Sequence, residues 1–284
     1  MILVTGAKGQ LANELKLFLP SDKAVFLDKE ECDISNLEQL EKVLDKYNIE
    51  LIINCAAYTA VDKAETDSTN AFLINEKGVA NLAFLTKKNN LKLIHISTDY
   101  VFGGPNFRPI KEDSKTEPNS VYGKSKLAGE EQIIKINPKA IIIRTSWLYS
   151  KFGHNFVKTI LKNSKIRDSL KVVYDQVGTP TNAADLASAI MQIIPQMDGL
   201  KETELYHFSN EGVASWYDFA YAIKEIKNLK ISIFPIETSE YPLPAPRPQY
   251  SVLSKNKIKD KFKLTIPHWR ESLGKCLRSI GEDF

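Results

Sequence analysis

The chain has 284 residues, of which 43% are hydrophobic and 26% are charged, and its formal net charge at pH 7 is +3. This length and composition are typical of a globular protein that buries a large core, in one domain or in one domain with a smaller appendage. Lysines are spread along the whole sequence, so the small charge predicts neither a nucleic-acid groove nor binding to an anionic membrane surface.

Short apolar runs in the first half predict the strands of a parallel sheet. They lie at residues 2–4, 24–27, 51–54, 92–97 and 140–145. Continuous apolar runs separated by amphipathic stretches are typical of strands buried on both faces of a parallel sheet. Between them the sequence predicts helices over 10–19, 36–47 and 70–88, the second with Ser35 as its N-cap. We therefore expect an α/β fold with a Rossmann-type, doubly wound parallel sheet.

The regular alternation ends near Trp147. Residues 174–194 predict a loop and then a helix that is capped near Thr181 or Asn182. Four prolines within residues 241–251 exclude a helix there. We assign residues 1–146 and about 179–198 to a dinucleotide-binding domain, and about 147–178 and 199–284 to a smaller C-terminal α/β substrate-binding lobe.

The first predicted strand runs directly into a glycine-rich turn. Gly6 and Gly9 allow a tight turn and a close approach of the backbone to a pyrophosphate at the start of the next helix. The third position of this motif is Ala12, and the spacing Gly-x-x-Gly-x-x-Ala differs from the Gly-x-Gly-x-x-Gly pattern. The strand-to-helix context favours a dinucleotide site over an ordinary tight turn.

Residues near the second predicted strand bear on whether the cofactor is NADH or NADPH. Asp28 stands about 20 residues beyond the turn, where a carboxylate binds a ribose 2′-hydroxyl and favours NADH. Lys8 or Lys29 could instead serve the 2′-phosphate of NADPH, so the sequence leaves this choice open, and Asp28 has the alternative interpretation of a solvated loop carboxylate. Asp33 and Ile34 are candidates to flank the adenine, with a turn as the alternative role of Asp33.

Polar residues after the fourth strand predict a catalytic site. Thr98 and Tyr100 follow this strand, and ligands of open α/β sheets bind outside the carboxyl ends of the strands. Tyr122 and Lys126 stand four residues apart and so share one helix face. We expect the Lys126 ammonium to lie beside the phenol and to lower its pKa, which would make Tyr122 a proton donor.

Several longer motifs run along nearly the whole chain. They are "TGAKGQLANEL", "NCAAYTAVDKAE", "LINEKGVANLA", "ISTDYVFGG", "VYGKSKLAGE", "IIIRTSWLY", "DQVGTPT", "SWYDFA" and "RPQYSVL". Together they resemble the extended short-chain dehydrogenase/reductase family, and within it the dTDP-4-dehydrorhamnose reductases. The resemblance implies reduction of the 4-keto group of dTDP-4-dehydro-6-deoxy-L-mannose to dTDP-L-rhamnose, with hydride from NADPH or NADH.

The resemblance also implies roles for individual residues. The catalytic residues are Thr98, Tyr122 and Lys126. Cofactor contacts fall on Gly6, Gly9, Gln10, Leu11, Asp28, Ala56, Ala57, Tyr58, Tyr122 and Lys126. The sugar pocket falls on Thr59, Val61, Thr98, Tyr100, Tyr122 and Trp147, and Arg247 is expected to contact a substrate phosphate.

A metal and a partner chain are further implications of the resemblance. Some family members bind Mg²⁺ at a carboxylate-rich interface of a homodimer, and Glu14 matches one ligand. A solvated helix glutamate is the alternative interpretation of Glu14. Cys32, Cys55 and Cys276 are odd in number and far apart, which favours reduced thiols in the cytoplasm over disulfides or a thiolate metal site. No secretory leader pattern precedes the first strand, and no apolar run approaches the ~18 residues of a membrane helix.

Other functions remain to be weighed against the reductase. Nucleotide-sugar dehydratases place an Asp-Glu pair after the threonine, whereas here Asp99 is followed by Tyr100. The alternative from another class is a non-catalytic, NADP-binding regulatory subunit that resembles that of methionine adenosyltransferase. The presence of all three catalytic residues favours the enzyme. Cys55, His95 and His154 are expected to serve packing and hydrogen bonding rather than catalysis.

Overall fold

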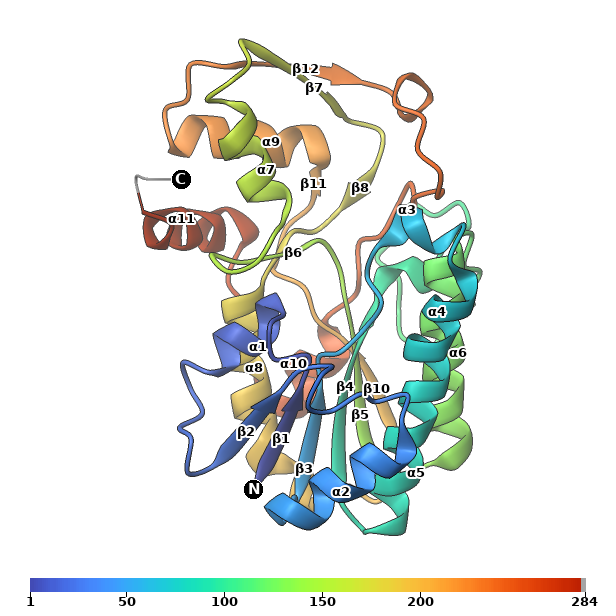
Figure 1. Cartoon of the computed structure of the whole chain (residues 1–284). Helices are drawn as coiled ribbons and strands as arrows, with labels where there is room; N and C mark the ends of the chain where they lie inside the picture. The colour runs from blue at the N-terminus through green and yellow to red at the C-terminus, as the bar shows by residue number, and fades with distance from the viewer. Residues whose placement is uncertain (282–284) are drawn as a thin grey trace.

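Six parallel strands form the central sheet, in the order β10-β5-β4-β3-β1-β2. The computed structural model, shown in Figure 1, describes residues 1–281. The strands of this sheet are β1 (Ile2–Thr5), β2 (Ala24–Leu27), β3 (Leu51–Asn54), β4 (Lys92–Thr98), β5 (Lys139–Thr145) and β10 (Glu204–His207). All five strands that the apolar runs predict are confirmed, as is the doubly wound α/β class.

Helices cover both faces of this sheet (Figure 1). One apolar core lies between the sheet and α1 (Gln10–Leu15), α8 (Ala183–Ile193) and α10 (Asn256–Phe262). The other lies between the sheet and α2 (Leu37–Tyr47), α5 (Val79–Lys88) and α6 (Val121–Ile136). Because both faces are covered, the strands carry continuous apolar residues rather than an alternating pattern.

Two helix predictions need correction in detail. The N-cap of α2 is Asn36, whose side chain accepts a hydrogen bond from the N–H of Gln39, so Ser35 is not the cap. The helix expected over 70–88 consists of α4 (Ser68–Phe72), a π-helical segment η1 (Leu73–Gly78) and α5. The cap near Asn182 is confirmed, because the Asn182 side chain accepts a hydrogen bond from the N–H of Ala184.

A second lobe lies beyond the carboxyl edge of the sheet (Figure 1). Its apolar core joins α7 (Phe156–Asn163), α9 (Trp216–Ile226) and α11 (Trp269–Ser279) with β7 (Ser169–Val173) and β12 (Ser232–Ile236), which pair in parallel. The remaining short elements are α3 (Val61–Ala64), η2 (Asp99–Val101), β6 (Leu148–Tyr149), β8 (Val177–Gly178), β9 (Thr181–Asn182), η3 (Ile194–Gly199), β11 (Ala214–Ser215) and η4 (Thr238–Glu240).

One segment lies elsewhere than the domain division places it. Strand β10 pairs with β5, with Leu205 opposite Ile142, and Phe262 of α10 packs in the core of the sheet. Both elements fall within 199–284, the range assigned to the substrate lobe, so this part of the assignment is wrong. The remainder of the division stays a proposal. Within residues 1–281, no helix combines the length and apolar character needed to cross a bilayer.

Candidate functional site

A cavity of about 650 Å³ opens at the carboxyl edge of the sheet, between the two lobes. Strands β2 and β3 lie on opposite sides of β1, so the strand order reverses at the carboxyl ends of β1 and β3, the place where open α/β sheets bind ligands. Most of the predicted site residues line this cavity: Gly6, Gly9, Gln10, Leu11, Asp28, Asp33, Ile34, Ala56, Ala57, Thr59, Val61, Thr98, Tyr100, Tyr122, Lys126 and Trp147.

The glycine turn lies directly against the segment that follows β3. Gly6 has a φ of +67°, and a Cβ at this position would lie 2.8 Å from the Cα of Ala56. Only glycine fits both the left-handed backbone and this close approach. The N–H of Gly9 donates to the carbonyl of Gly6 at 2.9 Å, which closes the turn. A side chain at Gly6 would therefore push the turn away from the segment that follows β3.

Charged residues gather at the end of β2. The Lys8 ammonium lies 2.9 Å from an Asp28 oxygen and 3.1 Å from a Glu30 oxygen. The hydrogen bond to Asp28 is the main reason that the pKa of Lys8 is raised. Asp28 is therefore not an isolated loop carboxylate. It lines the cavity and holds the one lysine of the glycine turn beside it.

Tyr122 is buried at the cavity wall, near the N-terminus of α6. Burial raises the pKa of Tyr122 to about 12, and the negative Asp99 raises it further, whereas a hydrogen bond with Thr98 lowers it. Burial also raises the pKa of Asp99 to about 6. At neutral pH the phenol is therefore a protonated hydrogen-bond donor, aligned by the hydroxyl of Thr98.

Lys126 does not lie against this phenol as its helical spacing predicts. Its Nζ donates to the carbonyl of Ile96 at 2.8 Å and lies 3.4 Å from Nε2 of His95, both on β4. Burial lowers the pKa of Lys126 to about 8. The expectation that Lys126 lowers the pKa of Tyr122 is wrong for this structure, because the ammonium is turned toward the strand and the phenol is desolvated.

Aromatic side chains form part of the cavity wall. Trp147 has a φ of +47°, an uncommon conformation for a residue with a side chain, and its ring stacks on Trp216 at 3.7 Å between centroids. On the other side, Tyr100 meets Tyr122 edge to face at 5.3 Å. Trp216 thus supports the cavity wall from α9.

Three predicted residues do not line the cavity. The Tyr58 hydroxyl donates to Asp67 at 3.0 Å. The Arg247 guanidinium pairs with both oxygens of Asp62, at 2.5 and 2.7 Å, although a hydrogen bond with the Tyr100 hydroxyl joins it to the wall. Arg247 is therefore already neutralised by a carboxylate from α3.

Glu14, the third, is buried instead of solvated as the alternative interpretation held. It is 3% exposed and accepts a hydrogen bond from Ser150 at 2.6 Å. No cluster of three or more metal-ligating side chains occurs among residues 1–281. These contacts account for Glu14 as a link between α1 and the segment after β6.

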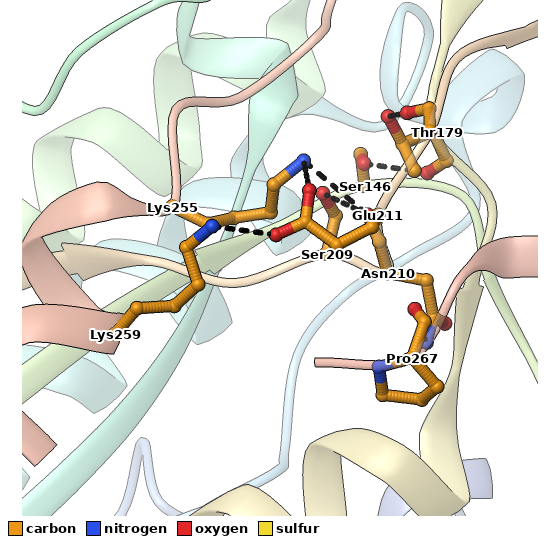
Figure 2. A network of polar contacts seen from close by, with 9 residues as sticks. Ser146, Thr179, Ser209, Asn210, Glu211, Lys255, Lys259 and Pro267 are labelled. Carbon is orange, nitrogen blue, oxygen red and sulfur yellow. Dashed lines mark hydrogen bonds and ion pairs between the residues drawn. The ribbon is translucent and has the colours of Figure 1, made fainter. Parts of the chain in front are cut away.

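A polar network behind the cavity ties the second lobe to the sheet (Figure 2). The ammonium groups of Lys255 and Lys259 pair with different oxygens of Glu211, at 3.3 and 2.7 Å. In the same view the Ser146 hydroxyl donates to the carbonyl of Thr179 at 2.8 Å, and Thr179 donates to the carbonyl of Gly212 at the same distance. Ser146 also lines the cavity, so the network fixes one part of its wall.

Sequence reasoning missed several residues that line the cavity. They are Cys32, Ile74, Ser146, Leu148, Gly153 and His154. The position of Ser146 directly after the β5 run was a usable signal, since carboxyl ends of strands meet at this edge. Leu148 lies on β6, and the others come from loops and a π-helical segment whose approach to the cavity depends on long-range packing. Cys55 also lines the cavity, and burial raises the pKa of its thiol to about 12.

Comparisons with known proteins agree with this geometry. The family model described as "RmlD substrate binding domain" matches residues 1–281. A curated dTDP-4-dehydrorhamnose reductase from Aggregatibacter actinomycetemcomitans is 39% identical over 99% of both chains. A crystal structure of a dTDP-4-dehydrorhamnose reductase from Clostridium acetobutylicum is 39% identical, has a TM-score of 0.93 and covers 98% of this chain and 99% of its own.

A second solved relative bears on the cofactor. The dTDP-4-dehydrorhamnose reductase from Bacillus anthracis, solved in complex with NADP, is 38% identical with a TM-score of 0.93, and the match covers 98% of each chain. The chain belongs to the family of the RmlD substrate binding domain, together with these dTDP-4-dehydrorhamnose reductases.

Proposed function

We propose that this chain is an NAD(P)H-dependent dTDP-4-dehydrorhamnose reductase, which reduces the 4-keto group of dTDP-4-dehydro-6-deoxy-L-mannose to give dTDP-L-rhamnose. The observation that carries the proposal is the protonated Tyr122 phenol, which lies with Thr98 in the same cavity as the glycine turn. The full-length reductase relatives support it. They do not favour the alternative of a non-catalytic regulatory subunit.

The proposed chemistry needs an acid at the ketone oxygen. Negative charge develops on that oxygen during reduction, and a donor already in place stabilises it and then supplies the proton. Tyr122 is the proposed acid because burial keeps its proton on the phenol at neutral pH. Thr98 is the proposed second donor to the same oxygen, and Tyr100, Val61, Thr59 and Trp147 are proposed to enclose the sugar.

The cavity residues fit a dinucleotide. Bound there, a reduced nicotinamide cofactor would supply the hydride. Gly6 and Gly9 are proposed to meet the pyrophosphate, and at Gly6 no Cβ would fit beside the Ala56 backbone. Asp28 and Lys8 are proposed to meet the adenosine ribose, and Lys126 the ribose on the nicotinamide side. The NADP complex of the Bacillus anthracis relative supports this assignment.

A few finer points rest on the sequence and the family resemblance alone. A homodimer, Mg²⁺ at its interface and a cytoplasmic location remain predictions, and so does the contact of Arg247 with a substrate phosphate. For that contact, the ion pair between Arg247 and Asp62 would have to open or be shared.

Absorbance of the reduced cofactor tests the proposed function. The protein is mixed with dTDP-4-dehydro-6-deoxy-L-mannose, and oxidation of NADPH and of NADH is followed in parallel reactions. We expect sugar-dependent oxidation of at least one cofactor. If both cofactors bind and neither is oxidised, the reductase assignment is wrong and the regulatory subunit becomes the better account.

Asp28 is predicted to favour NADH. In Asp28→Ala the ribose hydroxyl loses a charged acceptor, a loss of roughly ten- to hundredfold in NADH affinity. Lys8 loses one carboxylate partner and keeps Glu30, so affinity for the 2′-phosphate of NADPH should fall less. Dissociation constants of both cofactors measure this, with the exposed Asp22→Ala as a matched control. Equal weakening of both cofactors would remove Asp28 from cofactor discrimination.

A further inference from the structure

A row of buried polar contacts runs across the sheet and ends at Lys126. The Thr5 hydroxyl on β1 donates to Oδ1 of Asn54 on β3 at 2.7 Å. Nδ2 of Asn54 lies 2.9 Å from Nδ1 of His95 on β4, and Nε2 of His95 lies 3.4 Å from Nζ of Lys126. All four side chains are at most 2% exposed. The proposed reaction has not used His95.

The orientation of the Asn54 amide is fixed by a backbone donor. The N–H of Ala56 lies 3.1 Å from Oδ1 of Asn54 and can only donate, so this atom must be the carbonyl oxygen. The Thr5 hydroxyl donates to the same oxygen. Reversing the amide would set two donors against each other at Ala56. The amide nitrogen therefore faces His95.

This amide decides which ring nitrogen of His95 carries the proton. Because Nδ2 of Asn54 donates, Nδ1 of His95 must accept and carries no hydrogen. Burial, with a smaller contribution from Lys126, holds the pKa of His95 well below its usual range, so the ring is neutral. Its one proton is then on Nε2, the nitrogen that faces Lys126.

We propose that Asn54 and His95 are positioning residues for Lys126. They hold an imidazole Nε2–H against Nζ of Lys126. This contact disfavours the ammonium form, and it directs the N–H donors of the ammonium to the carbonyl of Ile96 and to the cavity. The contacts of Asn54, His95 and Lys126 do not depend on the proposed function. Only the role of Lys126 in catalysis rests on that function. A neutral amine could accept the Nε2–H, so both protonation states of Lys126 have a defined partner.

Two other groups that face Lys126 favour its ammonium form. The Glu130 carboxylate, on the same helix, and the Cys55 thiol raise its pKa, whereas burial lowers it and dominates. Glu130 is itself held by Arg144 and by the Ser97 hydroxyl, at 2.5 Å for the latter. His95 and the carbonyl of Ile96 are the neutral groups that contact Nζ of Lys126, and of these two His95 is the one proposed to set its proton equilibrium.

Nitrogen NMR of the imidazoles tests the inference on the unmodified protein. The chain is labelled with ¹⁵N-histidine, and the His95 signals are those that disappear in His95→Phe. We expect the hydrogen on Nε2, with no titration of the ring between pH 5 and 8. A hydrogen on Nδ1, or a ring that titrates in this range, would overturn the proposal. Neither result depends on whether the protein reduces a sugar.

A titration of Lys126 tests the consequence. With ¹³C-labelled lysine, the Lys126 signal is the one lost in Lys126→Met. Removing the Nε2–H in His95→Phe should raise the titration midpoint of Lys126 by at least about half a pH unit. His207→Phe is the matched control, since His207 is also buried and neutral but contacts Ile110. An unchanged or lower midpoint would contradict the proposed role.

A double variant tests whether the unpaired Asn54 amide, and not the loss of the imidazole, causes the shift. His95→Phe leaves Nδ2 of Asn54 without its acceptor, so Asn54→Leu in the same chain removes that unpaired donor. The double variant should show the same upward shift in the Lys126 midpoint. A shift that disappears in the double variant would assign the effect to the unpaired amide instead of the imidazole, and the proposal would fail.

Discussion

Replacement of Tyr122 by Phe is expected to lower turnover of the 4-keto sugar by at least ~10²-fold, the usual scale of general acid catalysis. The variant keeps the ring that packs against Tyr100 at 5.3 Å and removes only the hydroxyl. Cofactor affinity should change little, because the hydroxyl is proposed to act on the ketone oxygen. Steady-state turnover and a separate cofactor titration measure the two effects.

The control for this variant is Tyr221→Phe, which removes a hydroxyl from a half-exposed tyrosine on α9, outside the cavity. It should leave turnover and cofactor affinity unchanged. If Tyr122→Phe retains normal turnover, Tyr122 is not the acid. If turnover and cofactor affinity fall together, the hydroxyl serves binding, and the division of roles proposed here is wrong.

Arg144→Met is expected to lower the free energy of unfolding by about 3–5 kcal/mol, the usual effect of removing one partner from a buried ion pair. Arg144 on β5 meets the Glu130 carboxylate of α6 in a bidentate contact, with Nη2 at 2.6 Å and Nε at 2.9 Å. The two side chains are 4% and 0% exposed. The variant leaves the carboxylate with the hydroxyl of Ser97 as its remaining hydrogen-bond partner among residues 1–281. Urea denaturation at pH 7 measures the change.

The matched control for the ion pair is the double variant Glu130→Leu with Arg144→Met. It removes both charges and replaces them by apolar side chains of similar size, so most of the lost stability should return. A double variant that is as unstable as Arg144→Met would show that packing against α6, and not the unpaired carboxylate, determines the loss.

Much of the sheet and of the site could be predicted because both depend on local sequence. Buried strands of a parallel sheet need continuous apolar residues, and the runs at 51–54 and 140–145 have them. The carboxyl ends of such strands meet at one edge, so the amino-acid sequence was enough to place Thr98 and the turn at Gly6 at one cavity.

The features that escaped prediction depend on contacts distant in sequence. Strand β10 carries the polar sequence Glu-Leu-Tyr-His and is placed by its pairing with β5, not by an apolar run. Arg247 is neutralised by Asp62, which is 185 residues away. The direction of Lys126 depends on the carbonyl of Ile96 and on His95, which a helical spacing from Tyr122 does not reveal.

The most direct test of the reductase uses NADPH that carries deuterium at C4 of the nicotinamide, in the position from which hydride is transferred. It is incubated with the protein and dTDP-4-dehydro-6-deoxy-L-mannose, and the sugar is analysed by NMR and mass spectrometry. Deuterated NADH is used in a parallel reaction. The account predicts dTDP-L-rhamnose with one deuterium at C4 of the hexose. Unchanged keto sugar in both reactions, with cofactor binding demonstrated, would contradict it.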